Sequence, residues 1–330
     1  MQDAPRFQSQ SNTTHPAGWA ASAAEARVPG SGGNATQPAA PGRVSGMSTP
    51  PTLLPLPQPG ETPVRVLTVA GSDSGGGAGL QADLRTMALL GVHGCTAVTA
   101  VTVQNTLGVT GVHEVPADTV AAQVRAVVYD IGVGAVKTGM LASTPIITAL
   151  AEVFAELGIG KGSHVPLVLD PVAASVTGDP LFTGSAQNAL TRSLFPLATL
   201  LTPNLDEVRL FTGIDVVDGA TQREAARVLH GLGPRWVLVK GGHLRTSPVS
   251  TDVLFDGQEF TELSAARVPT TDDHGAGDCL GAATACALAH GWDVAAAVAL
   301  GKDWATRCVG AAYPLGSGHG PVSPLWRLRG

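Results

Sequence analysis

The sequence is poor in the features that mark several classes of protein. Only 4% of its 330 residues are aromatic, and no run of 18 uncharged apolar residues predicts a membrane-spanning helix. The four cysteines form no C-x-x-C pair, which argues against a zinc ribbon or a redox motif. The formal charge of −6 comes without a basic stripe. We therefore expect no membrane partner and no nucleic-acid partner.

Small aliphatic residues dominate the composition instead. Hydrophobic residues make up 44% of the chain and charged residues 14%, and 41 residues are glycine. A chain of this composition can bury a large core and is not wholly disordered. Cys95, Cys279, Cys286 and Cys308 are expected to be buried, reduced thiols. With no signal-peptide pattern in the chain, these thiols lead us to expect a cytoplasmic protein.

The N-terminal segment differs in composition from the rest of the chain. Proline, glycine, serine and threonine supply nearly half of residues 1–60, which hold only five charges. The proline-rich stretch 51–60 fits neither a helix nor a central strand, because proline lacks an amide hydrogen and fixes φ. We predict a disordered Pro/Ala/Gly-rich tail over 1–62 and a single domain over 63–330. Translation from Met47 is one hypothesis.

From residue 64 onward, short apolar runs alternate with helical stretches. Strands are expected at 64–70, 94–104, 134–139, 165–170, 197–203 and 236–240, with an antiparallel pair at 250–255 and 258–264. Helices are expected at 78–90, 117–129, 144–157, 184–194, 206–211, 221–230, 276–289 and 294–310. Alternating strands and helices form βαβ units with right-handed crossovers. The predicted fold is an α/β three-layer sandwich with a mostly parallel central sheet.

Polar residues and glycines follow most of the predicted strands. Ligands of such sheets bind at the carboxyl ends of the strands, where the helices begin. The positions concerned are Asp73, Gln104, Lys137, Met140, Asp170, Asn204, Lys240 and the turn before Ala276. We expect the chemistry of the protein at these positions.

The segment DDHGAGDCLGAA, 272–283, carries the strongest single motif. Gly275 and Gly277 let backbone amides turn inward at the start of an alanine-rich helix, and such amides form an anion site together with Ala276 and the helix dipole. Asp278 lies in the first turn of that helix. It is either a residue that compensates the helix dipole or the base that takes a proton from an attacking hydroxyl.

Other motifs add to this one. GAGD at a helix start near the C-terminus resembles the ribokinase superfamily. The further segments are AGSDSGGGAGLQADLRT (70–86), TAVTVQNTLGV (99–109), KTGML (137–141), VLDPV (168–172), GDPL (178–181), LTPNLDE (201–207) and KGGH (240–243). In order and spacing, over about residues 66–322, they resemble the bacterial hydroxymethylpyrimidine/phosphomethylpyrimidine kinase family of thiamine biosynthesis.

This resemblance implies a ribokinase-like fold and an activity. The activity is the ATP-dependent phosphorylation of 4-amino-5-hydroxymethyl-2-methylpyrimidine, and of its monophosphate to the diphosphate. ATP and Mg²⁺ are the implied cofactors. The partner is the small pyrimidine substrate, and a homodimer is expected because dimers are common in the family.

The resemblance also implies which residues hold the pyrimidine. Asp83 matches an aspartate that accepts a hydrogen bond from the aminopyrimidine; otherwise it is an aspartate on a helix surface. Gln104 matches a glutamine that pairs with the ring, and an amide can both donate to and accept from a pyrimidine edge. Otherwise it is an ordinary polar residue at a strand end. Four positions match pocket-lining residues or are core residues: Ala78, Thr102, Met140 and Val172.

The remaining assignments concern phosphate and metal. Lys240 resembles a lysine that reaches the nucleotide phosphates, and Lys302 a lysine near the phosphate of the substrate. His274 is grouped with the cofactor-binding residues. Asn204 and Glu207, in an N-x-x-E pattern, imply a Mg²⁺-linked role, partly through water. They also fit an N-terminal capping box. Asp170 ends a nearby strand and is the third candidate for the metal.

The chain departs from the family pattern in one important place. The family motif is HGTGC, whereas this chain has HGAGD, with Asp278 at the position of the cysteine. A carboxylate is a stronger base than a neutral thiol, but it adds negative charge near an incoming phosphate. Pyridoxal kinase of vitamin B6 salvage is therefore the alternative function. A non-catalytic ligand-binding regulator on the same fold and a dehydrogenase are weaker ones, because Asp278, Lys240 and Glu207 are all present and no G-x-G-x-x-G pattern occurs.

Overall fold

The computed structural model describes residues 53–173, 184–242, 244 and 247–329, which all belong to one unit, 48–330. Of the predicted tail, residues 1–52 lie outside the described part. Within 53–62, Leu53 and Leu54 pack on the domain, which a disordered tail does not predict, whereas residues 58–62 are exposed. Leu54 is 2% exposed within a core cluster. Leu56 and Pro57 lie so close to Gly91 that a Cβ there would be 2.9 Å from each.

A nine-stranded sheet forms the middle layer. Its order is β3-β2-β1-β4-β5-β6-β7-β8-β9. Strands β2, β1, β4, β5, β6 and β7 run parallel, and β3, β8 and β9 join the two edges antiparallel. The bounds are β1 Arg65–Ser72, β2 His93–Asn105, β3 Gly108–Glu114, β4 Ala135–Thr138, β5 Leu167–Leu169, β6 Leu200–Leu201, β7 Trp236–Val239, β8 Val249–Phe255 and β9 Phe260–Ala266.

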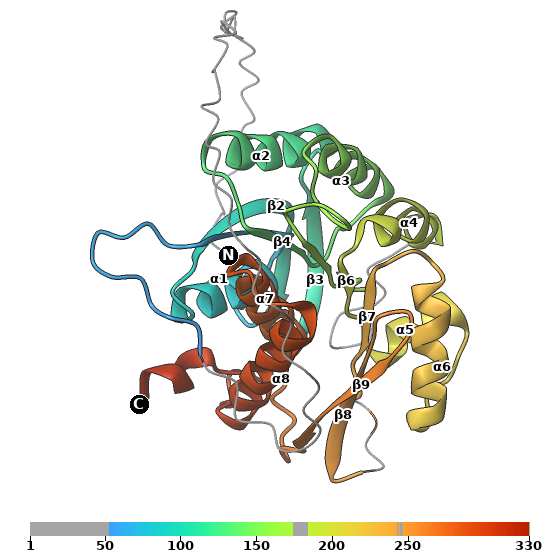
Figure 1. The fold of residues 1–330 in the computed structure, drawn as a ribbon. Coiled ribbons are helices and arrows are strands. Elements are labelled where there is room, and N and C mark those ends of the chain that lie inside the picture. The colour runs from blue at the N-terminus through green and yellow to red at the C-terminus, as the bar shows by residue number, and fades with distance from the viewer. Residues whose placement is uncertain (1–52, 174–183, 243, 245–246, 330) are drawn as a thin grey trace, which may run out of the picture. The chain divides into compact units, whose positions relative to one another are not determined.

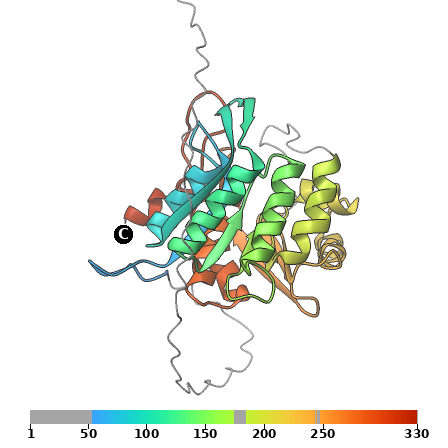
Figure 2. The ribbon, with the colours of Figure 1, turned by 90° about the horizontal axis from the view of Figure 1, so that it is seen from above.

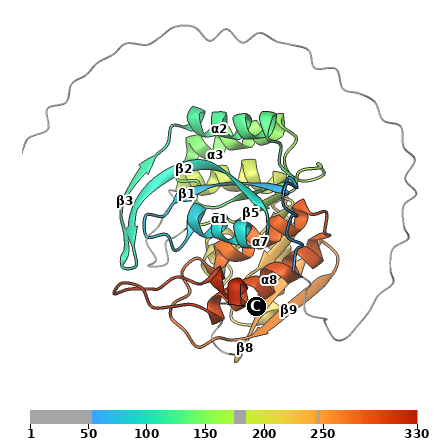
Figure 3. The same ribbon diagram turned by 90° about the vertical axis from the view of Figure 1, so that its left-hand side faces the viewer.

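Helices cover both faces of this sheet (Figures 1 and 3). One core cluster joins the sheet to α2 Ala117–Asp130, α3 Thr144–Glu156, α4 Gly184–Ala189, α5 Leu205–Thr212 and α6 Gly219–His230. Figure 2 shows α2 and α3 side by side in this layer. The other cluster joins it to α1 Gly79–Leu89, α7 Ala276–Ala289 and α8 Val294–Gly310. The predicted three-layer α/β/α sandwich with a mostly parallel sheet is confirmed.

Helix α7 lies in the middle of its layer and is buried on all sides. Every residue from Cys279 to Leu288 is buried, so this helix shows no amphipathic pattern. Small residues let its neighbours approach. At Gly301 of α8, a Cβ would collide with the hydroxyl of Thr284 on α7. Helix α7 is thereby packed closely between α8 and the sheet, against which it contacts β1, β4 and β5.

Some elements differ from the predicted ones. Strand β3 was not predicted; a turn in which Asn105 Oδ1 accepts from the amide of Leu107, at 2.8 Å, connects it to β2. A short 3-10 helix, Pro324–Arg329, was also not predicted. The expected helix 184–194 continues from α4 as one π-helical turn, Leu190–Leu194. Strands β5 and β6 are shorter than expected. Among the described residues, no helix is long and apolar enough to cross a membrane.

Candidate active site

A cavity of about 910 Å³ lies at the carboxyl ends of the parallel strands. It brings together residues from β1, β2, β8, α5, α7 and α8 and from the positions directly after β4, β5 and β7. Its wall includes all but one of the predicted site residues: Ala78, Thr102, Gln104, Met140, Asp170, Val172, Asn204, Glu207, Lys240, His274, Gly275, Ala276, Gly277, Asp278 and Lys302. The exception is Asp83. The GDPL segment, 178–181, lies outside the described residues.

The start of α7 is built from glycine for steric reasons. Gly275 is the N-cap, with φ of 85°, and a Cβ there would collide with the carbonyl oxygen of Gly77. The amide of Ala276 donates to Asp273 O at 3.1 Å. The next amides, those of Gly277 and Asp278, have no intrahelical acceptor, as at every helix start. Both residues line the cavity, and amides in this position at a helix start can donate to an anion.

Asp278 is anchored from two sides. Its Oδ2 accepts from the amide of Gly79 at 3.1 Å, and its Oδ1 lies 2.8 Å from Lys137 Nζ. The side chain is 14% exposed, so the carboxylate reaches the cavity while both of its oxygens are held. This fixed geometry suits a group that must accept a proton at one place.

Asp83 does not lie where the sequence placed it. It is fully buried beneath the cavity, and both of its oxygens are bonded, at 2.9 Å, to Lys137 Nζ. Oδ2 also accepts from Thr68 Oγ1 at 2.6 Å. In this structure Asp83 is therefore not available to an aminopyrimidine, and the prediction that it contacts substrate is wrong. Burial raises the pKa of Asp83 to about 7, with Asp278 adding to the effect and Lys137 opposing it.

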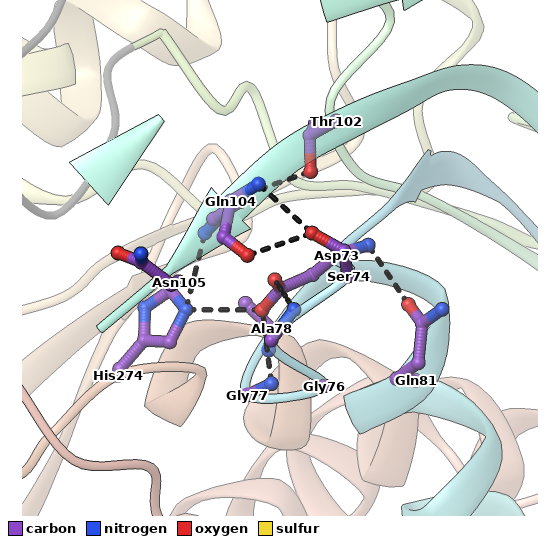
Figure 4. A network of polar contacts seen from close by, with 12 residues as sticks. Asp73, Ser74, Gly76, Gly77, Ala78, Gln81, Thr102, Gln104, Asn105 and His274 are labelled. Atoms are coloured by element: carbon purple, nitrogen blue, oxygen red, sulfur yellow. Dashed lines mark hydrogen bonds and ion pairs between the residues drawn. The ribbon is translucent and has the colours of Figure 1, made fainter. Parts of the chain in front are cut away.

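Asp73 shapes the glycine-rich loop after β1 (Figure 4). Its Oδ1 accepts from the amide of Gly75 at 2.8 Å, and its Oδ2 accepts from the amides of Gly77 and Ala78 at 2.9 Å. His274 Nε2 lies 3.2 Å from the same Oδ2. Burial alone would raise the pKa of Asp73, but the hydrogen bonds from His274 and the loop amides lower it overall. Asp73 is thus an ionised acceptor.

His274 links this loop to Gln104. The Gln104 amide lies 3.3 Å from His274 Nε2. One ring nitrogen cannot donate to Asp73 and accept from Gln104 at once, and an ionised carboxylate can only accept. The proton count therefore favours the Nε2–H tautomer, which donates to Asp73. The other end of the Gln104 amide accepts from the hydroxyl of Thr102 at 3.2 Å, and this hydroxyl also lies 2.9 Å from Ser72 O. Each end of the amide keeps one hydrogen-bonding position for a ligand.

The position of His274 bears on one prediction. His274 was grouped with the cofactor-binding residues, and its partners are Gln104, which is expected to bind the pyrimidine, and Asp73, which shapes the loop after β1. Its Nδ1 is buried and has no hydrogen-bond partner among the described residues. The loop after β1 packs against the imidazole at Gly77, and this contact holds His274 beside Asp73 and Gln104.

The other half of the cavity carries a second lysine and carboxylate pair. Lys240 Nζ lies 2.8 Å from Asp170 Oδ1, which also accepts from Thr202 Oγ1 at 3.0 Å. Burial would lower the pKa of Lys240, but Asp170 and Glu207 raise it. A Cβ at Gly277 would be 3.3 Å from Lys240 Nζ. The glycine therefore lets the lysine lie directly beside the anion-binding amides.

Asn204 and Glu207 form a capping box at the start of α5. Asn204 Oδ1 accepts from the amide of Glu207 at 2.9 Å, and Glu207 Oε2 accepts from the amide of Asn204 at 2.7 Å. Glu207 Oε1 accepts from the amide of Ala173 at 3.3 Å. Burial raises the pKa of Glu207 to about 7, with Asp170 adding to the effect and Lys240 opposing it. The capping interpretation of this pair is confirmed.

Lys302 lies farther along the wall, on α8. Its Nζ is 2.9 Å from Asp252 Oδ2 and donates to Ser250 Oγ at 3.1 Å, both on β8. Asp252 Oδ1 accepts from the amide of Gly241, next to Lys240. Lys302 is therefore in the cavity wall as predicted, but its partners are on β8 and not around Asp278.

Three functional positions received no role from the sequence. Asp73 and Lys137 were noted only as strand-end residues, and Asp252 was not noted. The sequence offered one signal for Lys137: it is a lysine inside the apolar strand β4, and a buried lysine needs a charged partner. Nothing in the sequence shows which carboxylates it meets.

The chain is similar to several known proteins. A family model described as phosphomethylpyrimidine kinase matches residues 73–323. The chain is 62% identical to a hydroxymethylpyrimidine/phosphomethylpyrimidine kinase from Mycobacterium leprae, over 83% of this chain and 98% of that protein. It is 47% identical to a thiamine biosynthesis bifunctional protein from Geobacter sulfurreducens, over 79% of this chain and 52% of that protein.

Solved structures share the fold. A pyridoxal kinase from Bacillus subtilis, in an ADP complex, has a TM-score of 0.73 at 34% identity, over 81% of this chain and 99% of the other. A phosphomethylpyrimidine kinase from Clostridium difficile has a TM-score of 0.65 at 35% identity, over 74% of this chain and 98% of the other.

Proposed function

The chain belongs to the phosphomethylpyrimidine kinase family, and we propose that Asp278 is the base of its phosphoryl transfer. Its activity is that of a hydroxymethylpyrimidine/phosphomethylpyrimidine kinase of thiamine biosynthesis. The observation that supports the proposal is the fixed Asp278 carboxylate, which lies at the glycine-built start of α7 in the shared cavity. Gln104 and His274 lie in the same cavity, as does Lys240.

The first reaction transfers a phosphoryl group to an alcohol. Asp278 takes the proton of the hydroxymethyl group as its oxygen attacks the γ-phosphorus of ATP. The bond between the γ-phosphorus and the β–γ bridging oxygen breaks, and ADP leaves with the electron pair. The amides of Gly277 and Asp278, with Lys240, stabilise the charge on the transferring group. Gln104 offers a donor and an acceptor to the aminopyrimidine edge.

The second reaction has a phosphate as its acceptor. A phosphate monoester is largely ionised near pH 7, so this step needs charge neutralisation more than proton removal. Lys302 is the proposed second cation for it. The side chain is 12% exposed in the cavity wall, and it shares its charge with Asp252.

The donor set around Lys240 fits a magnesium ion. Asp170 and Glu207 are buried carboxylates that raise the pKa of one shared lysine, so an added divalent cation would relieve their repulsion. The described residues contain no group of three or more His, Cys, Asp or Glu side chains able to enclose a metal. This agrees with an ion held by one or two carboxylates, water and phosphate oxygens. Such an ion would supply charge neutralisation on the phosphates, and Asn204 would act through Glu207.

The proposed assembly is a homodimer in the cytoplasm. Val101 and Val103 on β2 and Leu107 in the following turn are 47%, 64% and 64% exposed, which leaves an apolar surface at the β2–β3 edge. The four cysteines are free thiols, as expected of a reducing compartment. Light scattering on the purified full chain measures the mass, and a monomer at micromolar concentration would contradict the dimer.

The test of function is a product assay. The full chain is incubated with Mg·ATP and, separately, hydroxymethylpyrimidine, its monophosphate or pyridoxal, and the products are resolved by mass. We expect the pyrimidine monophosphate and diphosphate, and no more than slow turnover of pyridoxal. Asp278→Asn, which keeps the shape but removes the base, is expected to lower the first reaction by about 100-fold or more. Undiminished turnover by this variant would exclude Asp278 as the base.

A further inference from the structure

A buried lysine lies directly beneath Asp278. Lys137 of β4 is 0% exposed, which a lysine tolerates only when its charge is compensated. Its Nζ contacts Asp83 Oδ1 and Oδ2 at 2.9 Å and Asp278 Oδ1 at 2.8 Å. One cation thus joins two carboxylates, one buried and one in the cavity wall.

The surrounding backbone leaves room for this arrangement. A Cβ at Gly281 of α7 would be 3.3 Å from Lys137 Cε, and a Cβ at Gly139 would be 3.3 Å from Lys137 Nζ and 3.8 Å from Asp278 Oδ1. Thr68 fixes Asp83 from the other side with a hydrogen bond of 2.6 Å. The side chain of Lys137 is therefore confined to one conformation, in which its ammonium group contacts Asp83 and Asp278.

We propose that Lys137, held in place by Asp83, is the positioning residue of the reaction: it keeps the Asp278 carboxylate ionised and oriented toward the acceptor hydroxyl. This rests on the proposed role of Asp278 as the base. The role of Lys137 also explains how this chain can carry an aspartate, Asp278, where the family motif has a cysteine. The lysine beneath Asp278 offsets the negative charge that an incoming acceptor phosphate would otherwise meet.

Other charged groups around the three are few. Asp170 of the neighbouring strand end acts on Lys137, and Lys240 is influenced by Asp278. On α7, the Cys286 thiol lies near Asp83, and burial raises its pKa, so it is neutral. Burial would lower the pKa of Lys137, but Asp278 and Asp83 raise it, so the lysine stays charged throughout the working range of pH.

The test is the dependence of kcat on pH, with hydroxymethylpyrimidine and Mg·ATP both saturating. A base must be deprotonated, so kcat rises with pH along an acid limb that reports the protonation of the base. Lys137→Met removes the cation beside Asp278, and we expect this acid limb to move upward by about one unit or more. Asp83→Asn keeps the lysine, and burial raises the pKa of Asp83 to about 7, so this variant loses no charge below that pH and its limb is expected to stay in place.

Different responses of the limb to two neighbouring substitutions separate this proposal from a structural role. If Lys137 only held the fold together, both variants would lose kcat with the limb unmoved. Lys161→Met is the matched control, because the ammonium group of Lys161 donates to the carbonyl of Gly233 at the surface, away from the cavity. It is expected to keep the wild-type profile. Titration of the nucleotide is common to all variants and cancels in the comparison.

The outcomes remain decisive if Lys137→Met does not fold. Lys137→Gln, which keeps a polar group but removes the charge, is the second variant, and an unmoved limb in it would overturn the proposal. The failure of the proposed function is distinct: it would appear as undiminished turnover by Asp278→Asn. An inactive Asp278→Asn together with unmoved limbs in the Lys137 variants would overturn only the role of Lys137.

Discussion

At the scale of single residues, the start of α7 depends on a glycine that no other residue can replace. Gly275 combines φ of 85° with contact between its Cα and the loop at Gly77. We expect Gly275→Ala to lower kcat by about 100-fold or more, because a displacement near 1 Å at the reacting groups has this effect. It should also reduce the melting temperature. Steady-state kinetics and thermal unfolding measure the two effects.

Gly291 provides the control for that substitution. Its φ is 83°, nearly that of Gly275, but a Cβ there would meet nothing within 4 Å. Gly291→Ala therefore reports backbone strain alone. We expect it to lower the free energy of unfolding by about 1–2 kcal/mol and to leave kcat near that of the wild type. Equal losses of kcat in the two variants would mean that strain, and not the collision at Gly77, disables the site.

A second prediction at this scale concerns His274. Its hydrogen bond to Gln104 places it with the acceptor and not with the nucleotide. Loss of one hydrogen bond costs about 0.5–1.5 kcal/mol, so His274→Phe is expected to raise KM for hydroxymethylpyrimidine by about 2- to 12-fold. KM for ATP should change little.

Lys240 provides the comparison for His274, because its substitution should affect KM for the other substrate. Lys240→Met is expected to raise KM for ATP more than KM for the pyrimidine, because Lys240 lies beside the anion-binding amides. Initial rates with each substrate varied in turn give both constants. A rise in KM for ATP alone in His274→Phe would restore the histidine to the cofactor-binding residues.

At the scale of elements, two helices begin with capping boxes but only one of them borders the cavity. Asn204 and Glu207 cap α5, and Asp218 and Thr221 cap α6. We expect Asn204→Ala and Asp218→Ala to lower the free energy of unfolding by similar amounts, about 1 kcal/mol each. Only Asn204→Ala should raise KM for ATP, because its partner Glu207 lies near Lys240 and Asp170.

Denaturant unfolding and initial rates measure the two effects in the same preparations. Asp218 is the appropriate control, since its box is complete and its residues are not in the cavity wall. If both variants raised KM for ATP equally, the effect would come from general destabilisation. The position of Glu207 would then not matter to the nucleotide.

Most elements were predictable because they have their own local signals. Asn204 followed by Glu207 identifies a helix start, and β1 reads as an apolar β-branched run. Strand β3 carries two glycines in seven residues and depends on pairing with β2, which no local pattern reports. The packing of Leu54 onto the domain is likewise a tertiary contact.

The sequence predicted the site residues at the ends of the strands, but not the contacts of the buried residues beneath the cavity. The motif at 272–283 located Asp278, because glycines and an acid at a helix start have a defined chemistry. Asp83 was misplaced because a match of motif does not tell on which side of α1 its carboxylate lies. In this chain it points down to Lys137, a partner 54 residues away.

At the scale of the whole molecule, buried carboxylates link stability to pH. Burial raises the pKa values of Asp83 and Glu207 to about 7 in the folded state, whereas unfolded carboxyls titrate near 4. Between these values the folded state binds protons that the unfolded state has lost. Stability therefore falls as pH rises from about 4 to about 7, with a slope of up to ~1.4 kcal/mol per unit for each group.

Asp83→Asn removes one of the two groups and is expected to make this slope shallower. Urea unfolding at pH 5 and pH 8 gives the free energies, and the variant should gain stability relative to the wild type as pH rises. Asp256→Asn is the control, because hydrogen bonds from the amides of Glu259 and Gln258 lower the pKa of Asp256. It is already ionised throughout this range, so its loss should leave the slope unchanged. An identical slope in Asp83→Asn and the wild type would mean that Lys137 holds Asp83 ionised at all these pH values, since only a carboxyl that takes up a proton in the folded state can produce the difference.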